Sequence, residues 1–343
     1  MARPAPGLSK INFRCRYAVL CMTALLIVHT PFGYAEPSGE IQIFVENDFL
    51  AGTDRYYSNG LKIGFGAQKE AWPKPVQNWL ESVYSYLGRD KQYEQGFFLG
   101  QSIYTPRDIR TSEAQPNDRP WAGWLYAGWA LQRLTPEPRP TLDTLELNIG
   151  VIGPPALAKP VQTQWHKLIG APEPRGWTHQ LPTEPGFMLG YLKKIKFGSD
   201  TLDIIPHAGA TVGTIMTFAR AGGIVRLGKN LSGFGPDSVE AGGAMLQGTH
   251  AKNPGRPRCE YYLFAGFDVR AVAYNAFLDG NLLRSSPGVD RKPVVYDVLS
   301  GLSLRYRAAR LSLTQIRRSE EFSSNGIGSG RQTFHSLNFG LEF

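Results

Sequence analysis

The last ten residues, FHSLNFGLEF (Phe334 to Phe343), alternate between two kinds of side chain. Mostly apolar residues fall on one side of an extended chain: His335, Leu337, Phe339, Leu341 and Phe343. Small or polar residues fall on the other side: Ser336, Asn338, Gly340 and Glu342. A strand separates residues in this way because its side chains point to alternate faces, whereas a helix repeats every 3.6 residues. The stretch therefore predicts a β-strand with one apolar and one polar face.

The same alternation recurs at Leu145 to Val151 (LELNIGV). Counting similar segments gives twelve candidate strands, near residues 40–49, 58–68, 94–104, 121–134, 142–153, 186–198, 201–216, 217–229, 259–275, 292–307, 308–321 and 331–343. A strand of a soluble β-sandwich can alternate in this way too. However, several segments approach the roughly 9–11 residues that a tilted strand needs to cross a bilayer. We therefore predict an all-β fold, a single transmembrane antiparallel β-barrel of about twelve strands with short loop helices.

Composition supports a barrel and excludes other classes. After residue 35 the chain has no run of 18 or more apolar residues, which excludes helical membrane spans. The whole sequence of 343 residues has 38 glycines, 7 tryptophans, 15 tyrosines and 18 phenylalanines, a composition that suits a barrel. The formal charge of +8 falls to +4 without the first 35 residues, because these hold four of the 37 basic residues and none of the 29 acidic ones. This modest excess, with no Lys/Arg block, predicts no nucleic-acid partner.

The first 35 residues have the three parts of a signal peptide. The basic part contains Arg3, Lys10, Arg14 and Arg16. The apolar run YAVLCMTALLIV spans Tyr17 to Val28, and the small-residue cleavage site GYA ends at Ala35. A run of about twelve residues is shorter than the roughly 20 that a spanning helix needs. We expect residues 1–35 to be removed on export, which leaves 36–343 as one barrel domain with a single cysteine, Cys259, and no internal disulfide.

Three stretches interrupt the strand pattern. Residues 73–87 and 159–170 carry apolar residues at helical spacing, and the second ends at Gly170. We predict short helices there, within loops, where barrels commonly carry function. Residues 230–258 are predicted to form a long, mobile loop that contains Gly and Ser.

The hairpin VENDFLAGTDRYYSNG (Val45 to Gly60) is the first candidate site. It places carboxylate, amide and hydroxyl oxygens close together in the chain, on Asn47, Asp48, Asp54, Ser58 and Asn59. Calcium accepts such mixed oxygen ligands, although the spacing is not that of an EF-hand. A polar hairpin turn is the alternative, because Asn, Asp and Gly favour turns. The spacing alone favours the turn.

The second candidate is His166, within the predicted helix 159–170. By helical angle it lies beside Gln162, at the polar edge of the apolar stripe formed by Val161, Trp165 and Ile169. A histidine in such a place can accept a proton from water near neutral pH. An interfacial histidine without a role is the alternative. No histidine has metal-ligand spacing, so a zinc site is not expected.

A third motif, NDRPWAGWLYAG (Asn117 to Gly128), precedes and forms an aromatic strand. Asp118 and Arg119 are interpreted as a local ion pair at the start of that strand. Its aromatic residues are candidates for the girdle at the membrane interface: Trp121, Trp124, Tyr126 and Trp129. The chain has no G-x-S-x-G motif, which argues against an α/β-hydrolase. A serine hydrolase of another kind stays open, because catalytic triads are defined in space.

Four stretches in order resemble the outer-membrane lipid A 3'-O-deacylase family of LpxR-like proteins, over roughly residues 40–343. They are the hairpin, NDRPWAGWLY, LNIGVIGPPAL with VQTQWHKLIGAPEPRGWTHQL, and FLDGN with YDVLSGLSLRYR. The residues that match the family's catalytic and calcium-binding positions are His166, Asn47, Asp48 and Ser58. Those that align with its further substrate-contacting positions are Arg107, Arg110 and Glu173.

The resemblance implies a calcium-dependent ester hydrolase that removes 3'-linked acyloxyacyl chains from lipid A. His166 would accept a proton from water, and Ca²⁺, held by Asp48 with oxygens of Asn47 and Ser58, would stabilise the oxyanion. Lipopolysaccharide is the expected substrate, and the protein is expected to be surrounded by the lipid of the outer membrane. The C-terminal aromatic residue, Phe343, predicts insertion by the barrel-assembly machinery, and we expect a monomer. Two other hypotheses stay open: a barrel esterase or phospholipase with a serine nucleophile, and a non-enzymatic porin or adhesin.

Overall fold

A computed structural model describes residues 39–68, 72–87, 92–136, 139–236, 257–325 and 327–343. The predicted signal peptide, residues 1–35, lies outside the described residues, as does most of the predicted loop 230–258. Among the described residues, no helix combines the length and the apolar character needed to span a membrane.

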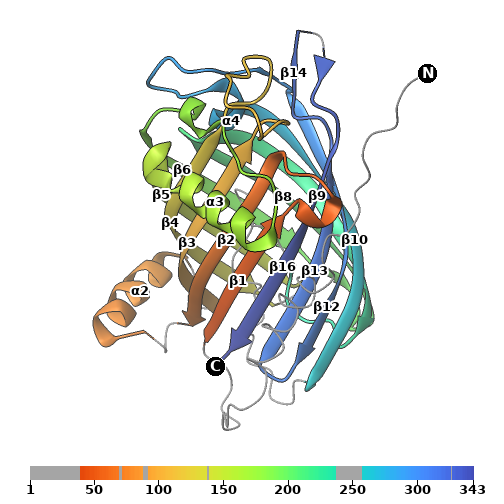
Figure 1. Ribbon diagram of the computed structural model, residues 1–343. Helices are drawn as coiled ribbons and strands as arrows, with labels where there is room; N and C mark the ends of the chain where they lie inside the picture. Colours follow the sequence, from red (N-terminus) through yellow and green to blue (C-terminus); the bar gives the residue numbers. More distant parts are fainter. Residues whose placement is uncertain (1–38, 69–71, 88–91, 137–138, 237–256, 326) are drawn as a thin grey trace, which may run out of the picture.

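Twelve long antiparallel strands form a closed barrel within the described chain (Figure 1). They are β1 (Gly39–Asn47), β2 (Tyr56–Gln68), β3 (Gln92–Thr105), β4 (Ala122–Thr135), β5 (Thr141–Ile152), β6 (Glu184–Ile195), β8 (Leu202–Gly213), β9 (Met216–Lys229), β10 (Cys259–Asn275), β12 (Val294–Tyr306), β13 (Ala309–Arg318) and β16 (Gln332–Glu342). Each pairs with its neighbours in sequence, and the first strand closes on the last, with Glu40 opposite Glu342 and Asn47 opposite His335. The predicted barrel is therefore confirmed.

Short elements connect the long strands. The helices are α2 (Lys74–Leu87), α3 (Ala158–Ile169) and α4 (Ala276–Asp279), with 3-10 turns η2 (Phe49–Ala51), η4 (Pro154–Ala156) and η5 (Trp177–His179). Strand β7 (Phe197–Gly198) pairs with β8, and β11 (Asp290–Arg291), β14 (Phe322–Ser324) and β15 (Ile327–Gly328) form a separate small sheet. Helices α2 and α3 coincide, to within one residue at either end, with the two predicted helices.

The outer face of the barrel is mostly apolar, and many of the side chains that face the lumen are polar. In β16 the lumen-facing Ser336, Asn338 and Glu342 are 2–3% exposed, and their neighbours are more accessible. Leu99 and Leu263 on the outer face are 65% and 63% exposed. This arrangement inverts that of a soluble protein, because a bilayer solvates apolar side chains and closed strand pairing satisfies the backbone.

Ion pairs join the strands from inside the barrel. Arg226 and Asp203 lie 2.6 Å apart, and Arg318 and Asp297 lie 2.8 Å apart, all of them largely buried. A buried charge needs such a partner, since removing one member leaves the other uncompensated. Cys259 is a free cysteine and forms no disulfide. The described barrel is therefore stabilised by these ion pairs and by the closed ladder of hydrogen bonds between strands.

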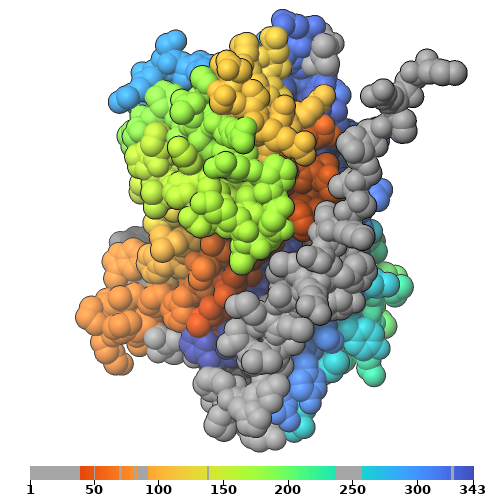
Figure 2. Space-filling view, viewed as in Figure 1, coloured from red at the N-terminus to blue at the C-terminus, as the bar shows by residue number. Residues whose placement is uncertain are grey.

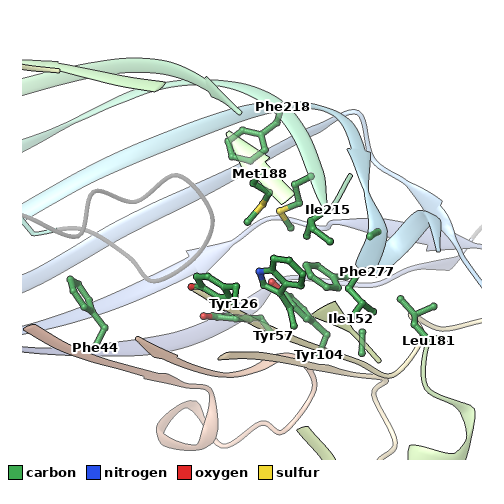
Figure 3. Packing of buried hydrophobic residues seen from close by; sticks show 14 of the residues in the cluster. Phe44, Tyr57, Tyr104, Tyr126, Ile152, Leu181, Met188, Ile215, Phe218 and Phe277 are labelled. Atoms are coloured by element: carbon green, nitrogen blue, oxygen red, sulfur yellow. The ribbon is translucent and has the colours of Figure 1, made fainter. Parts of the chain in front are cut away.

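An aromatic cluster fills the barrel between β2, β3 and helix α4 (Figure 3). Tyr104 stacks on Phe277 with ring centroids 4.1 Å apart. The same cluster includes Trp124 and Tyr126 of β4, which are 2% and 5% exposed. Trp121 is buried as well, at 2%. The prediction of a membrane girdle from these three residues is therefore wrong, because alternation along β4 turns Trp124 and Tyr126 into the barrel and α3 and its flanking residues cover Trp121.

The outward orientation of the apolar side chains can be tested at Phe267, which lies in the middle of β10 and is 56% exposed. We expect Phe267→Arg to lower the free energy of unfolding by about 2–4 kcal/mol, because it places a charge near the bilayer midplane. Urea unfolding of the barrel in lipid vesicles measures this change. Leu283→Arg is the control, since Leu283 is 70% exposed outside the strands. Equal effects of the two substitutions would contradict the orientation.

Candidate active site

Helix α3 and the residues beside it cover part of the outer wall of the barrel (Figures 1 and 2). Phe97 and Leu99 on the outer face of β3 are 51% and 65% exposed, yet Ile103, further along the same face, is 0% exposed. Gly123 of β4 allows the close approach, because a Cβ atom there would lie 2.5 Å from the Cβ atom of Ala158. Helix α3 therefore covers a part of the outer barrel surface that would otherwise face lipid.

The ends of α3 are set by two residues in the left-handed region. Leu157 precedes the helix with φ +58°, and Gly170 ends it with φ +70° and a backbone N–H that donates to the carbonyl of His166. The predicted apolar stripe faces a cavity against the wall: Val161, Trp165 and Ile169. Gln162 and His166, beside that stripe, are buried in the structure.

The β1–β2 hairpin is held by its own polar side chains. Asn47 accepts a hydrogen bond from the backbone N–H of Phe49 at 2.7 Å and donates one to the carbonyl of Ser58 at 2.9 Å. The Asp48 carboxylate accepts from the Thr53 hydroxyl at 2.9 Å and from the Arg55 backbone N–H at 2.8 Å. These bonds hold Asp48 at 1% exposure beside the end of β1.

A cavity of about 280 Å³ lies between this hairpin and α3. Its apolar lining includes Val45, Leu61, Ile103, Val161, Trp165 and Ile169. Its polar lining includes Asn47, Asp48, Asp54, Ser58, Gln162 and His166. Val45 and Leu61 are each 37% exposed and alternate with lumen-facing residues, so the cavity lies on the outer side of the barrel wall. An apolar chain can enter here next to polar groups.

His166 is 4% exposed, and both of its ring nitrogens have partners. Nδ1 is hydrogen-bonded to the carbonyl oxygen of Pro172, which can only accept, so Nδ1 carries the proton. Nε2 lies 3.3 Å from Oδ2 of Asp54. The sequence predicts Asp54 only as a possible cation ligand of the hairpin. No sequence signal links Asp54 with His166, because they belong to the hairpin and to α3.

The cavity contains two carboxyl groups, and burying both in their charged form is energetically unfavourable. Burial raises the pKa of Asp48 to about 8, the Arg55 backbone N–H opposes that rise, and the charge of Asp54 adds to it. Burial also raises the pKa of Asp54, against the opposing effects of His166 and Gln162. A bound cation would offset the cost of both charges.

Ser58 contributes a hydroxyl to the same cavity, where it is 3% exposed. Its Oγ lies 2.6 Å from the hydroxyl oxygen of Thr105, and either group can be the donor. Within the described chain its side-chain partner is thus Thr105 and not His166. A serine nucleophile would instead need a base within hydrogen-bonding reach.

The cavity offers carboxylate, amide and hydroxyl oxygens, which are the type of ligand that a hard cation prefers. The described residues contain no group of three or more His, Cys, Asp or Glu side chains that could hold a metal ion. Asp48 and neutral oxygens of Asn47 and Ser58 would have to hold it, and calcium accepts carboxylate, amide and other oxygen ligands in flexible geometry. The residues present therefore fit calcium better than zinc, which prefers nitrogen and sulfur.

The three predicted substrate contacts lie elsewhere. Arg107 donates to the hydroxyl of Tyr56 at 3.0 Å and to the carbonyl of Ser329 at 2.9 Å. Arg110 and Glu173 are exposed, and none of the three lines the cavity. The structure thus brings His166, Asn47, Asp48 and Ser58 together, and it does not bring Arg107, Arg110 or Glu173 to them.

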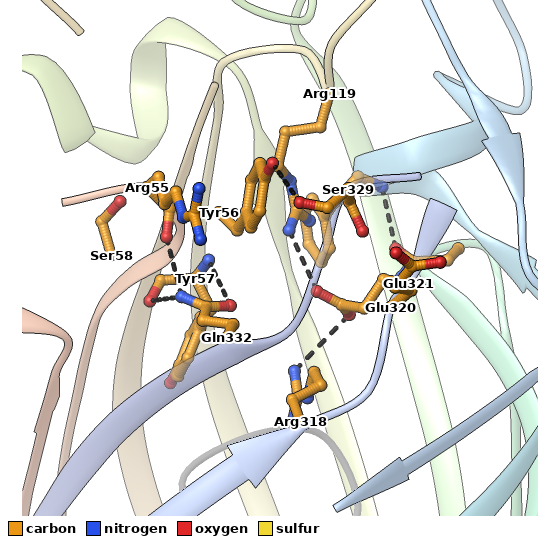
Figure 4. Close-up of polar contacts among 12 residues, drawn as sticks. Arg55, Tyr56, Tyr57, Ser58, Arg119, Arg318, Glu320, Glu321, Ser329 and Gln332 are labelled. Atoms are coloured by element: carbon orange, nitrogen blue, oxygen red, sulfur yellow. Dashed lines mark hydrogen bonds and ion pairs between the residues drawn. The ribbon is translucent and has the colours of Figure 1, made fainter. Parts of the chain in front are cut away.

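The structure corrects the interpretation of Asp118 and Arg119 as a local ion pair, because Arg119 has a different partner (Figure 4). Arg119 does not pair with Asp118 but lies 3.2 Å from Glu321, which in turn lies 3.5 Å from Arg318. Asp118 instead accepts hydrogen bonds from the backbone N–H groups of Arg107 and Arg119. The partner of Arg119 is 202 residues away, so adjacency in sequence was misleading.

Comparison with known proteins gives two informative matches. The family model described as outer membrane protein LpxR matches residues 19–343. Among solved structures, LpxR from Salmonella typhimurium is 22% identical, with a TM-score of 0.67 over 89% of this chain and 100% of that one. The β domain of the Bordetella autotransporter BrkA is 9% identical, with a TM-score of 0.44 over 90% of this chain and 100% of that one. No curated protein matches the sequence.

Proposed function

The chain belongs to the LpxR family of outer membrane proteins, and on that basis we propose that it is a calcium-dependent lipid A 3'-O-deacylase. It hydrolyses the ester that joins the 3'-linked acyloxyacyl chain to lipid A. The chain itself is an outer-membrane β-barrel. A non-enzymatic porin or adhesin is the competing hypothesis, and conductance without hydrolysis would identify it.

One observation carries the proposal: a histidine, a carboxylate and a hydroxyl meet in a cavity on the outer side of the barrel wall. An enzyme that acts on a soluble ester has no need of a site there. Acyl chains of membrane lipids, in contrast, lie against the outer wall. The apolar lining from β1, β2 and α3 supports binding of such a chain beside the polar groups.

The proposed mechanism assigns one task to each residue. His166 accepts a proton at Nε2 from the water that attacks the ester carbonyl, and it returns this proton to the 3'-hydroxyl of lipid A as the ester C–O bond breaks and the acyloxyacyl chain leaves as a carboxylic acid. Its Nδ1–H stays bonded to Pro172 throughout and fixes the ring. Asp48, with oxygens of Asn47 and Ser58, would hold calcium, which would supply positive charge opposite the developing oxyanion. Helix α3 and the wall keep bulk water out and hold the acyl chain. Arg107 and Arg110 remain candidates for contacts to lipid A phosphates, and Glu173 for a further substrate contact.

The proposed function also requires that the protein be exported to the outer membrane. Residues 1–35 act as a signal peptide, and residues 36–343 form the mature barrel domain. We propose that the barrel-assembly machinery inserts it into the outer membrane. We propose that the mature enzyme acts as a monomer, because His166, Asp48, Asn47 and Ser58 line a single cavity within one chain.

Mass spectra of lipid A test the function directly. Cells that express the protein should contain lipid A lighter by the mass of the 3'-linked acyloxyacyl chain, and cells without it should not. Cells that express His166→Ala at the same level are the matched control. Unchanged lipid A in isolated outer membranes supplied with calcium would overturn the proposal.

The hypothesis of a serine nucleophile predicts covalent capture of Ser58. We expect no labelling of the wild type by a fluorophosphonate probe, because the Ser58 hydroxyl is hydrogen-bonded to Thr105 and, within the described residues, to no base. Ser58→Thr should keep activity within about tenfold, since the hydroxyl oxygen is retained and one hydrogen bond is worth about 1 kcal/mol. Labelling that disappears in Ser58→Ala, with activity that persists in excess chelator, would establish the serine mechanism instead.

A further inference from the structure

His166 cannot act as a base in the arrangement described. Its Nδ1 is committed to the carbonyl of Pro172, and its Nε2 faces the Asp54 carboxylate at 3.3 Å. General-base catalysis needs a ring nitrogen within hydrogen-bonding reach of the attacking water. Asp54 must therefore leave Nε2 before the reaction can begin.

Asp54 is the more exposed of the two carboxylates in the cavity. The Asp48 side chain is fixed by the Thr53 hydroxyl and the Arg55 backbone and is 1% exposed. The Asp54 side chain is 29% exposed, and the groups that face it are side chains of α3, His166 and Gln162. Both carboxylates line the same cavity, and the charge of Asp54 adds to the rise in the pKa of Asp48.

We propose that Asp54 is a second carboxylate ligand of the calcium site and, without calcium, a cap on His166. A bound ion draws Asp54 toward Asp48 and so frees Nε2 for water. Two carboxylates then balance the charge of the ion, where Asp48 alone balances half. This inference rests on the proposed function, because it takes His166 as the base and calcium as the cofactor. It makes Asp54 a positioning residue that couples the two.

Calcium binding tests the first half of the inference without any assay of activity. Calorimetric titration of calcium into the folded barrel in detergent should give a dissociation constant at least about tenfold higher for Asp54→Asn than for the wild type, because ligand charge sets the affinity of such sites. Glu113→Gln is the matched control, since Glu113 is an exposed acid outside the cavity. Equal affinities of Asp54→Asn and the wild type would overturn the role as a ligand.

Chemical modification of His166 tests the second half. Diethyl pyrocarbonate reacts with an unprotonated, accessible ring nitrogen, and peptide mass spectrometry measures the rate at His166 alone. We expect slow reaction of the wild type, accelerated severalfold by calcium. Asp54→Ala should react fast with and without calcium, and Asp54→Asn slowly in both cases, because the amide N–H that this substitution introduces can donate to the unprotonated Nε2. A wild-type rate that does not respond to calcium would overturn the cap.

The two proposals fail in different ways. If Asp48→Ala abolishes calcium binding and Asp54→Asn leaves it unchanged, the inference about Asp54 is wrong and the proposed function stands. If the wild type binds no calcium and still removes acyl chains from lipid A, calcium leaves the mechanism and the role of Asp54 falls with it.

Discussion

Replacing His166 with alanine should lower kcat by about 10²–10⁴-fold, the usual contribution of a general base. The loss follows from the geometry, because His166 lines the cavity and its Nδ1–H is held by Pro172 so that Nε2 faces the polar groups. The rate is measured on purified lipid A in detergent with saturating calcium. The substituted barrel should remain folded, because His166 lies on a helix outside the strand ladder.

Two further substitutions sharpen this prediction. His166→Gln should be as inactive as His166→Ala, because an amide of similar size cannot take the proton. His179→Gln is the matched control, since His179 is an exposed histidine outside the cavity and should keep full activity. If His166→Ala keeps more than about a tenth of wild-type kcat, the residue contributes less than about 1.4 kcal/mol and the base lies elsewhere.

Removal of calcium should abolish hydrolysis, and replacement of Asp48 should have the same effect. Asp48 is the carboxylate that the hairpin holds rigidly in the cavity, so its loss should weaken the hold on the ion most. Excess EGTA should stop the reaction, and calcium should restore it. Magnesium should substitute poorly, because it demands tighter octahedral geometry and gives up water reluctantly.

Asp48→Asn is the better variant for this test. It keeps an oxygen that can accept the hydrogen bonds of Thr53 and Arg55, so the hairpin is preserved while the charge is lost. Glu113→Gln again serves as the control, because it removes an acidic residue outside the cavity. Undiminished hydrolysis in excess EGTA, or by Asp48→Asn, would remove the ion from the mechanism.

The sequence alone determined the barrel, because the signal for a membrane strand is local. Each strand must alternate between lipid and lumen with a period of two, and residues 145–151 and 334–343 do so without reference to the rest of the chain. The spacing of Val161, Trp165 and Ile169 likewise predicted α3 and its apolar face. Family resemblance then supplied His166, Asn47, Asp48 and Ser58, and the structure brings these four to one cavity.

Only the tertiary structure decided how these parts meet. The side of the barrel wall on which the cavity lies depends on α3 crossing over β3 and β4, which the pattern of the helix itself does not specify. The inward position of Trp124 and the pairing of Arg119 with Glu321 also escaped prediction. So did the contact between Asp54 and His166. Alternation fixes which residues share a face, but contacts between distant segments depend on strand register and loop packing, which no short stretch of sequence encodes.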